Sequence, residues 1–272
     1  MSDTLPPSPA PESAASAEAD DKRLDKVLAR AGICSRRDAK KLVAEARVTV
    51  NGKPPESPGA HVADSDIVVV DGKPIAKAEQ TKLWRYHKPP GLVTTHRDPQ
   101  GRTTVFERLP EGMPRVISVG RLDLNSEGLL LLTNDGALAR RLELPSTGWV
   151  RRYRVRVHGD VDPAQLLALE KGLRIDGESF GPIKAMLERQ QGSNAWLTIS
   201  LKEGKNREVR RVMQHLGWPV TRLIRVAYGP FQLGQLEVGA VEEVPGKVLR
   251  DQLGAKPEAE GTKTRANRRR PS

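Results

Sequence analysis

Residues 116–133, VISVGRLDLNSEGLLLLT, are the stretch around which the rest of the chain is organised. Apolar runs on both sides of Gly120 to Asp123 predict two short strands joined by a tight bend. The bend holds one carboxylate, Asp123, and rigid flanking strands would fix its position better than a mobile loop. An Asp in such a bend is more often a turn former or a helix cap. Spacing alone therefore favours a structural role for Asp123 over a catalytic one.

The chain around this stretch alternates strands with a few helices. Strands are predicted at 83–87, 152–157, 173–175, 183–188, 195–201, 220–226, 229–233 and 241–244, and helices at 136–142, from Asp162 onward and at 206–216, with a helical turn at 105–109. This order lacks the regular βαβ alternation of parallel sheets. Residues 80–250 are therefore expected to form an α+β domain on a mixed, largely antiparallel sheet.

One predicted strand carries an unusual pattern of charge. Residues 152–157, RYRVRV, alternate strictly, so that Tyr153 shares one face with two valines while three arginines occupy the other. The pattern predicts a half-buried strand with one wet, basic face.

A smaller domain is predicted at residues 21–76, as two helices followed by short strands. The helices have apolar residues at i, i+3 and i+4 spacing, Ser35 is a suitable N-cap for the second, and Asn51-Gly52 and Asp71-Gly72 mark hairpin turns. Their polar faces hold nine bases against three acids; the bases are Lys22, Arg23, Lys26, Arg30, Arg36, Arg37, Lys40, Lys41 and Arg47. Solubility alone does not require this imbalance, because either sign of charge would serve it. We interpret the face as a phosphate-binding surface, with a merely solvated face as the alternative.

Composition narrows the possible functions. The chain of 272 residues has a net charge of +11 and a pI near 9.9, which favour a polyanionic partner such as nucleic acid. No apolar run approaches the roughly 20 residues that span a bilayer, and a single cysteine, Cys34, fits a reducing cytosol. We expect a cytoplasmic, monomeric protein with no metal site, because the histidines and the cysteine lack ligand spacing. Residues 1–20 and 251–272 are predicted to be disordered tails, acidic and basic respectively.

The small domain also resembles a known module. Its sequence RLDKVLARAGICSRRDAKKLVAEARVTVNGKP is similar to the S4 RNA-binding domain over roughly 50 residues. The resemblance implies that the second helix, with Arg36, Arg37, Lys40 and Lys41, lies against structured RNA. In that setting Cys34 is expected to be a small packed hydrophobe, because no His stands near it in sequence to activate it.

The larger domain resembles the RsuA-like pseudouridine synthases, which isomerise uridine to pseudouridine in ribosomal RNA. The motifs that carry this resemblance are 88–91, 120–123, 153–155, 202–211 and 223–225, of which GRLDLNSEGLL and EGKNREVRRV are long and specific. The segments HKPPG and DPQGRTTVFERLP are most similar to the branch that modifies large-subunit RNA, the RluB-type branch. An S4 domain followed by these motifs is also the usual layout of the family.

The resemblance implies roles for individual residues. Asp123 takes the position of the catalytic nucleophile, and Arg210 that of a cation which keeps this carboxylate ionised in a desolvated pocket. Tyr153 is expected to stack on the target base and to assist proton transfer. Either Leu223 or Ile224 forms an apolar wall of the base pocket. The chemistry requires no metal and no redox cofactor, and the uridine must flip out of its stack.

The same resemblance places further RNA contacts around the pocket. These predicted RNA-binding residues are Lys88, Arg121, Lys205, Asn206 and Arg211, and Lys88 could instead only flank a turn. The implied partner is ribosomal RNA of the 23S type or a ribosome assembly intermediate. Two alternatives stay open: a non-catalytic RNA-binding or assembly factor, and a glycosidase-like enzyme. The glycosidase-like enzyme would need a second carboxylate, for which Glu127 is the near candidate.

Overall fold

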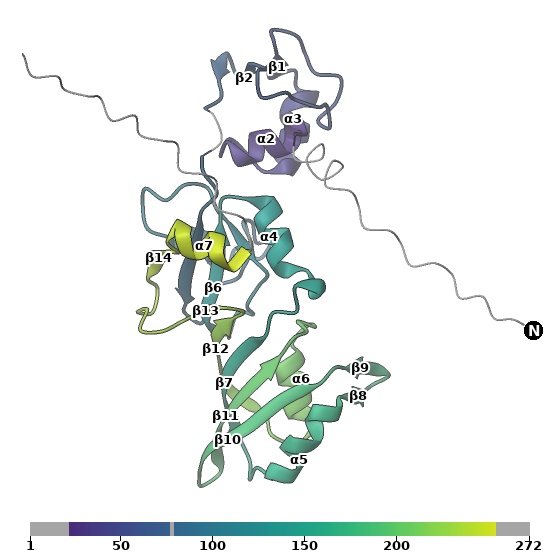
Figure 1. Cartoon of the computed structure of the whole chain (residues 1–272), viewed down its shortest axis with the longest axis vertical. Helices are drawn as coiled ribbons and strands as arrows, with labels where there is room; N and C mark the ends of the chain where they lie inside the picture. Colours follow the sequence, from purple (N-terminus) through teal and green to yellow (C-terminus); the bar gives the residue numbers. More distant parts are fainter. Residues whose placement is uncertain (1–21, 77–78, 254–272) are drawn as a thin grey trace, which may run out of the picture.

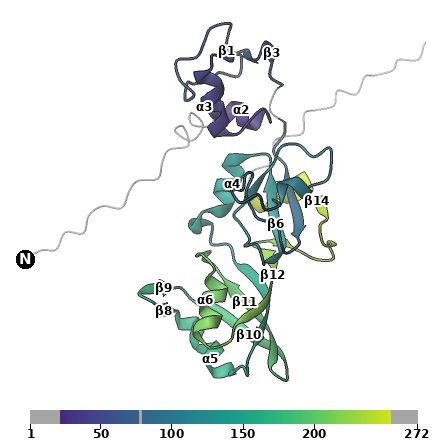
Figure 2. The same ribbon diagram turned by 180° about the vertical axis from the view of Figure 1, so that it is seen from behind.

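The computed structural model describes residues 22–76 and 79–253, which form a small N-terminal unit and a larger sheet-containing unit (Figures 1 and 2). The predicted acidic tail and most of the predicted basic tail lie outside these ranges. Within the described ranges, no helix is long and apolar enough to cross a membrane.

The small unit consists of two helices packed on a three-stranded antiparallel sheet. Its elements are α2 (Leu24–Arg30), α3 (Arg36–Ala44), β1 (Val48–Val50), β2 (Val68–Val70) and β3 (Lys73–Pro74). Helix α3 begins where expected, because the Ser35 hydroxyl accepts a hydrogen bond from the Asp38 N–H at 3.1 Å. Leu24, Leu28 and Val48 are fully buried between the helices and the sheet. Cys34 packs at the edge of this core, and burial raises the pKa of its thiol. A raised pKa disfavours the reactive thiolate, which agrees with the expected role of Cys34 as a packed hydrophobe.

The large unit is built on a nine-stranded sheet. Its order is β10-β11-β7-β12-β6-β4-β14, with β13 paired to β12 and β5 to β6. The strands are β4 (Leu83–Lys88), β5 (Ile117–Val119), β6 (Glu127–Thr133), β7 (Arg151–His158), β10 (Ile183–Gln191), β11 (Asn194–Leu201), β12 (Val220–Tyr228), β13 (Phe231–Gln232) and β14 (Val241–Glu243). Among these pairings, the one between β12 and β6 is parallel and the others are antiparallel. The expected α+β fold on a largely antiparallel sheet is therefore confirmed.

Strand β6 lies at the centre of the molecule and is buried on both faces. Leu129 and Leu131 pack under helices α4 (Gly136–Glu143) and α7 (Gly246–Leu253), whereas Leu130 and Leu132 pack under the segment 92–116. All four leucines are fully buried. Gly128 begins this run with φ of 97°, and a Cβ there would collide with the Arg225 carbonyl oxygen. A glycine is thus required where β12 runs alongside β6.

The other half of the sheet has helices on one face. Helices α5 (Pro163–Ala168) and α6 (Glu208–His215) cover a core that contains Val155, Val157 and Leu223 (Figures 1 and 2). A small two-stranded sheet, β8 (Leu173–Ile175) with β9 (Glu178–Phe180), adjoins this core. The alternate residues of β7, including Arg152, Arg154 and Arg156, are exposed, which confirms the predicted basic face.

Most predicted elements of the sheet are present, with differences at the ends. The bend of 120–126 does join two strands, and the turn expected at 105–109 is a 3-10 helix, Phe106–Arg108. Helix α7 was not predicted; it includes residues 251–253, which were assigned to the basic tail. The prediction missed α7 because its stripe, with Leu249 inward, is only two turns long.

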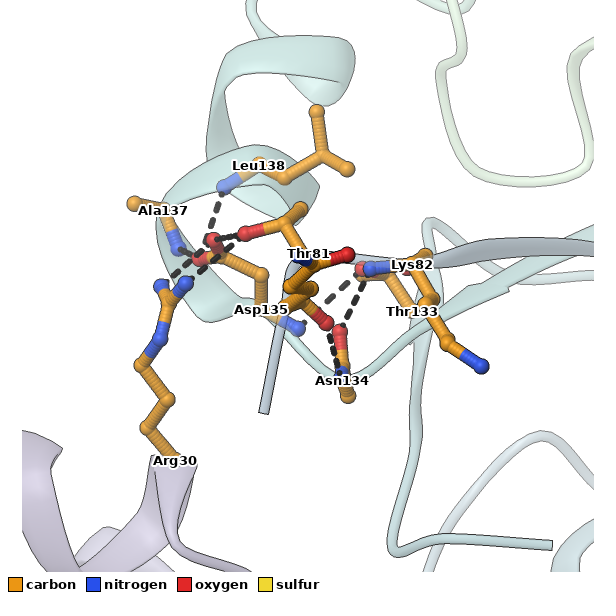
Figure 3. Close-up of polar contacts among 9 residues, drawn as sticks. Arg30, Thr81, Lys82, Thr133, Asn134, Asp135, Ala137 and Leu138 are labelled. Atoms are coloured by element: carbon orange, nitrogen blue, oxygen red, sulfur yellow. Dashed lines mark hydrogen bonds and ion pairs between the residues drawn. The ribbon is translucent and has the colours of Figure 1, made fainter. Parts of the chain in front are cut away.

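A side-chain cluster joins the two units (Figure 3). Arg30, the last residue of α2, donates to the Asp135 carboxylate at 2.5 Å and to the Thr81 hydroxyl at 2.7 Å. Asp135 also caps α4, because its Oδ1 accepts from the N–H groups of Ala137 and Leu138. One carboxylate therefore both starts a helix of the large unit and binds the small one.

Candidate active site

Asp123 lies in the bend between β5 and β6, and its side chain is 24% exposed. The Ser126 N–H donates to the Asp123 carbonyl at 3.0 Å and closes the turn. Glu143, at the end of α4, accepts from the Gly120 N–H, and Thr94 donates its hydroxyl to the Leu122 carbonyl at 2.8 Å. The bend is thus attached to α4 and to the segment after β4 as well as to its own strands.

Lys88 supports the same bend from inside the protein. Its side chain is fully buried, and its ammonium donates to the carbonyl oxygens of Pro89 at 3.0 Å, Ser126 at 2.9 Å and Leu124 at 3.4 Å. Burial lowers the pKa of Lys88 to about 8, against the opposing charges of Asp123 and Glu127. A fully buried ammonium cannot contact an RNA backbone, so the expected RNA-binding role of Lys88 is wrong.

A cavity of about 290 Å³ opens above Asp123. Most of its lining residues belong to the bend, β7, β12 and the segment before α6, and they include Arg121, Asp123, Arg151, Tyr153, Arg207 and Leu223. The volume lies at the lower end of the range of small-molecule pockets. Folding thus brings the 120–123, 153–155, 202–211 and 223–225 motifs to one cavity.

The cation nearest to Asp123 differs from the expected one. Arg207 Nη1 lies 3.6 Å from Asp123 Oδ2, whereas Arg210 donates to the carbonyl oxygens of Asn125 at 2.9 Å and Val220 at 3.2 Å. The expected Arg210–Asp123 ion pair is therefore wrong: Arg210 attaches the bend to the start of β12. Burial and the charge of Arg207 lower the pKa of Arg210, and the charge of Asp123 opposes them.

Tyr153 and Leu223, for which a stacking role and an apolar wall are expected, both line the cavity. Tyr153 is half-buried, lines the cavity and bridges the cores on either side of it. Leu223 lines the same cavity, while Ile224 packs toward the core under α4 and α7. The structure thus separates two candidates that the sequence could not, since adjacent strand residues point to opposite faces.

The remaining predicted contacts fall into two groups. Arg121, Lys205 and Asn206 line the cavity, and Lys205 pairs with Glu203 at 2.9 Å. Arg211 does not line it; its guanidinium pairs with Glu178 at 2.6 Å and lies over the Phe180 ring.

On α3 of the small unit, three of the four predicted contacts are exposed bases with no ion pair to a described residue: Arg37, Lys40 and Lys41. Arg36 instead binds Asp25 at 2.9 Å, and Asp25 is 1% exposed. The guanidinium of Arg36 therefore stabilises a buried carboxylate.

Some cavity residues were missed by the sequence analysis. Arg151 shares the face of Tyr153 on β7, and Arg225 shares that of Leu223 on β12, so strand alternation could have identified both. Glu208 is 4% exposed, accepts from the Lys205 N–H at 2.9 Å, and has its pKa raised by burial. Glu127, the carboxylate of the glycosidase alternative, does not line the cavity and binds Arg222 at 2.9 Å. Among the described residues, no cluster of His, Cys, Asp and Glu is arranged to hold a metal ion.

Comparison with known proteins identifies the family. A model of the RNA pseudouridylate synthase family matches residues 82–215, and a model of the S4 domain matches residues 22–68. A protein of Rickettsia felis named as an uncharacterized RNA pseudouridine synthase is 50% identical over 227 residues, which cover 84% of this chain and 98% of that protein. The chain belongs to the RNA pseudouridine synthase family. The predicted S4 domain and synthase resemblance are both confirmed.

Other relatives agree on the family. Ribosomal large subunit pseudouridine synthase B of Pseudomonas aeruginosa is 42% identical over 250 residues, which cover 87% of this chain and 64% of that protein. The corresponding protein of Haemophilus influenzae is 44% identical over 224 residues, covering 79% of this chain and 62% of that protein. The fold also matches a crystal structure of a pseudouridylate synthase with a TM-score of 0.59 and 26% sequence identity. The match covers 85% of this chain and 99% of the chain in that crystal structure. The synthase therefore has its family's fold from the S4 domain through the large sheet.

Proposed function

We propose that this synthase converts a uridine of large-subunit ribosomal RNA, of the 23S type, to pseudouridine, with Asp123 as the nucleophile. The observation that carries the proposal is the convergence of Asp123, Tyr153 and Arg207 on one cavity. The names of the relatives from Pseudomonas aeruginosa and Haemophilus influenzae support the choice of RNA. The substrate is free RNA or an assembly particle.

The reaction is an isomerisation and balances without a co-reactant. The N1–C1′ bond of the uridine breaks, a C5–C1′ bond forms, and a proton leaves C5 while N1 gains one. A carboxylate can act as a nucleophile that forms a covalent intermediate, which divides one difficult step into two easier ones. Asp123 supplies it here, with the Arg207 guanidinium 3.6 Å from its Oδ2.

The other cavity residues hold the base while it turns. The ring of Tyr153 offers a stacking surface, which is worth about 1–3 kcal/mol per base, and its hydroxyl is available for proton transfer. Leu223 closes the apolar side. The target base must leave its stack, and the exposed Arg121 beside Asp123 fills the vacated space or holds a phosphate at the mouth of the cavity.

The test is an Asp123→Asn variant assayed on ribosomal RNA lacking modifications. The amide keeps the shape of the side chain and loses the nucleophile, so turnover should fall by more than about a thousandfold while RNA affinity changes little. Pseudouridine is mapped by chemical labelling and primer extension, with exposed Asp160→Asn as the matched control. Turnover by Asp123→Asn within tenfold of wild type would exclude Asp123 as the nucleophile.

The same assay separates the second candidate, a non-catalytic RNA-binding or assembly factor. The S4 domain and its exposed bases would support binding equally well. A wild-type protein that binds the RNA but yields no pseudouridine at any position would favour this candidate. The supported cavity around Asp123 is the feature that such a factor does not need.

A further inference from the structure

One face of the sheet has no role in the cavity. Tyr153 and Leu223 point to the cavity side, so the alternate residues of β7 and β12 point to the opposite side. Helices α5 and α6 pack on the cavity side of this half, and α4 and α7 pack over β4 and β6. Among the described elements, no helix covers the other side of β7, β10 and β11. We name this side the open sheet face; its charged residues are Arg152, Arg154, Arg156, Lys184, Glu188, Arg189, Arg222 and Glu127.

The open sheet face is regular and strongly basic. Arg156, Trp196 and Arg189 lie side by side across β7, β11 and β10, and Arg152, Ser200 and Lys184 form a parallel row. Six basic side chains stand against two acidic ones. As on α3, solubility does not require such a surplus of one sign on one face.

The two acids are already engaged. Glu188 binds Arg154 at 2.9 Å, and Glu127 binds Arg222 through both oxygens at 2.9 Å. Arg152, Arg156, Lys184 and Arg189 make no ion pair with any described residue. Four cations are therefore available to bind anions from outside the chain.

The open sheet face also holds an aromatic ring, Trp196, surrounded by arginines. The Arg154 guanidinium lies 4.5 Å from the centroid of the Trp196 ring, and its bond to Glu188 fixes it there. Trp196 is partly exposed, between Arg156 and Arg189. Arginine around an aromatic ring is a usual composition of nucleic-acid surfaces, since guanidinium groups bind phosphate in a fixed geometry and rings stack on bases.

We propose that the open sheet face is a second RNA-binding surface, which holds the phosphate backbone of a substrate segment other than the one that enters the cavity. The inference rests on the proposed ribosomal RNA substrate. A protein partner would be expected to meet an apolar centre, but among the described residues of this face the one large apolar side chain that is strongly exposed is Met186. Tyr153 and Arg154 are neighbours that face opposite sides, so only an RNA long enough to pass around the sheet reaches both surfaces.

The experiment compares a long and a short RNA on the full chain. The variant is Arg156→Gln with Arg189→Gln, which flank Trp196, and the matched control is Arg140→Gln with Lys247→Gln, two exposed bases on α4 and α7. Binding of full-length large-subunit RNA and of a short hairpin around the target uridine is measured across a salt series. For the long RNA, the plot of log K against log salt should be less steep for the variant, by about 0.7–0.9 for each phosphate that it no longer binds. Affinity for that RNA should fall at least tenfold relative to the control.

Each outcome either supports or overturns the second surface. Weaker binding of the long RNA, with an unchanged hairpin affinity and an unaffected control, supports it. Equal losses of affinity in variant and control, or equal losses on both RNAs, would show only a general effect of net charge and overturn it. Binding of the long RNA by the variant with the affinity and salt slope of the control would also overturn it. Because binding is measured here and pseudouridine is not, failure of the catalytic proposal would be seen separately.

Discussion

At the scale of single residues, the site depends on backbone conformations that side-chain patterns do not reveal. Arg207 precedes α6 with φ of 50°, in the left-handed region that non-glycine residues seldom adopt. The predicted helix of 206–216 would have placed Arg207 within its first turn, whereas α6 begins at Glu208. The residue that pairs with Asp123 is therefore one whose conformation the helical pattern predicted wrongly. Such outliers cluster at functional sites.

Lys88 and Arg210 illustrate a second limit at this scale. Both were interpreted as ligands of a charged partner, yet both donate to main-chain carbonyls around the Asp123 bend. Sequence shows which residues carry charge but not which of them become buried. Their positions indicate that the bend is held by cations from two sides, β4 and α6.

The first prediction in this bend concerns Lys88→Met, which keeps the length of the side chain and removes its three donors. The bend should loosen, so kcat should fall more than tenfold while KM changes little, with Lys82→Met, a change at a partly exposed lysine, as control.

The same substitution should change how stability depends on pH. The pKa of Lys88 is lowered from 10.5 to about 8, so the unfolded state binds more protons between these values. The stability of wild type relative to Lys88→Met should therefore rise by up to about 3 kcal/mol from pH 8 to pH 10.5. Urea unfolding across this range measures it, and a constant difference would contradict the prediction.

At the scale of elements, periodicity predicted most of the fold because burial imposes it. β7 alternates, α3 begins after Ser35, and the four leucines of β6 form an uninterrupted apolar run since both faces are covered. What sequence could not supply is pairing order: β12 lies between β7 and β6, although both of these strands are far from it along the chain. Short elements such as α7 were missed because two turns give too little periodic signal.

Helix α3 allows a prediction about binding without chemistry. Replacing Arg37, Lys40 and Lys41 by Ala should weaken RNA binding and lower the salt slope by about two to three units, if each side chain contacts one phosphate. Arg36 is left in place because its removal would weaken the pairing of the buried Asp25. The change of Lys53 and Lys73, exposed bases of the same unit outside α3, serves as the control. A salt slope equal to wild type would show that this face is only solvated.

At the scale of the whole molecule, the described contacts between the S4 unit and the sheet unit centre on one carboxylate. Asp135 is 7% exposed. Its Oδ2 accepts hydrogen bonds from Arg30 and Thr81, and its Oδ1 accepts from the N–H group of Ala137 at the start of α4 (Figure 3). Helix α3, whose exposed bases we expect to contact RNA, and the cavity belong to different units, so their relative position decides whether one RNA can occupy both. The Arg30–Asp135 contact is a means of setting that position.

The last prediction follows from this contact. Arg30→Gln should leave the cap of α4 intact, because Ala137 and Leu138 still donate to Asp135 Oδ1 and Thr81 still donates to Oδ2, so the large unit should stay folded. The units should sample more orientations, which raises KM for long RNA several-fold at unchanged kcat and broadens the distance distribution in small-angle scattering.

Burial raises the pKa of Asp135, but the Thr81 hydrogen bond and the Arg30 charge outweigh it and hold that pKa below 3.8. The stabilisation is therefore fully present above about pH 4 and is lost only as the pH falls through the lowered value. Wild type should show the narrow distribution from about pH 5 to 8, and the same distribution in Arg30→Gln would mean that other contacts orient the S4 unit.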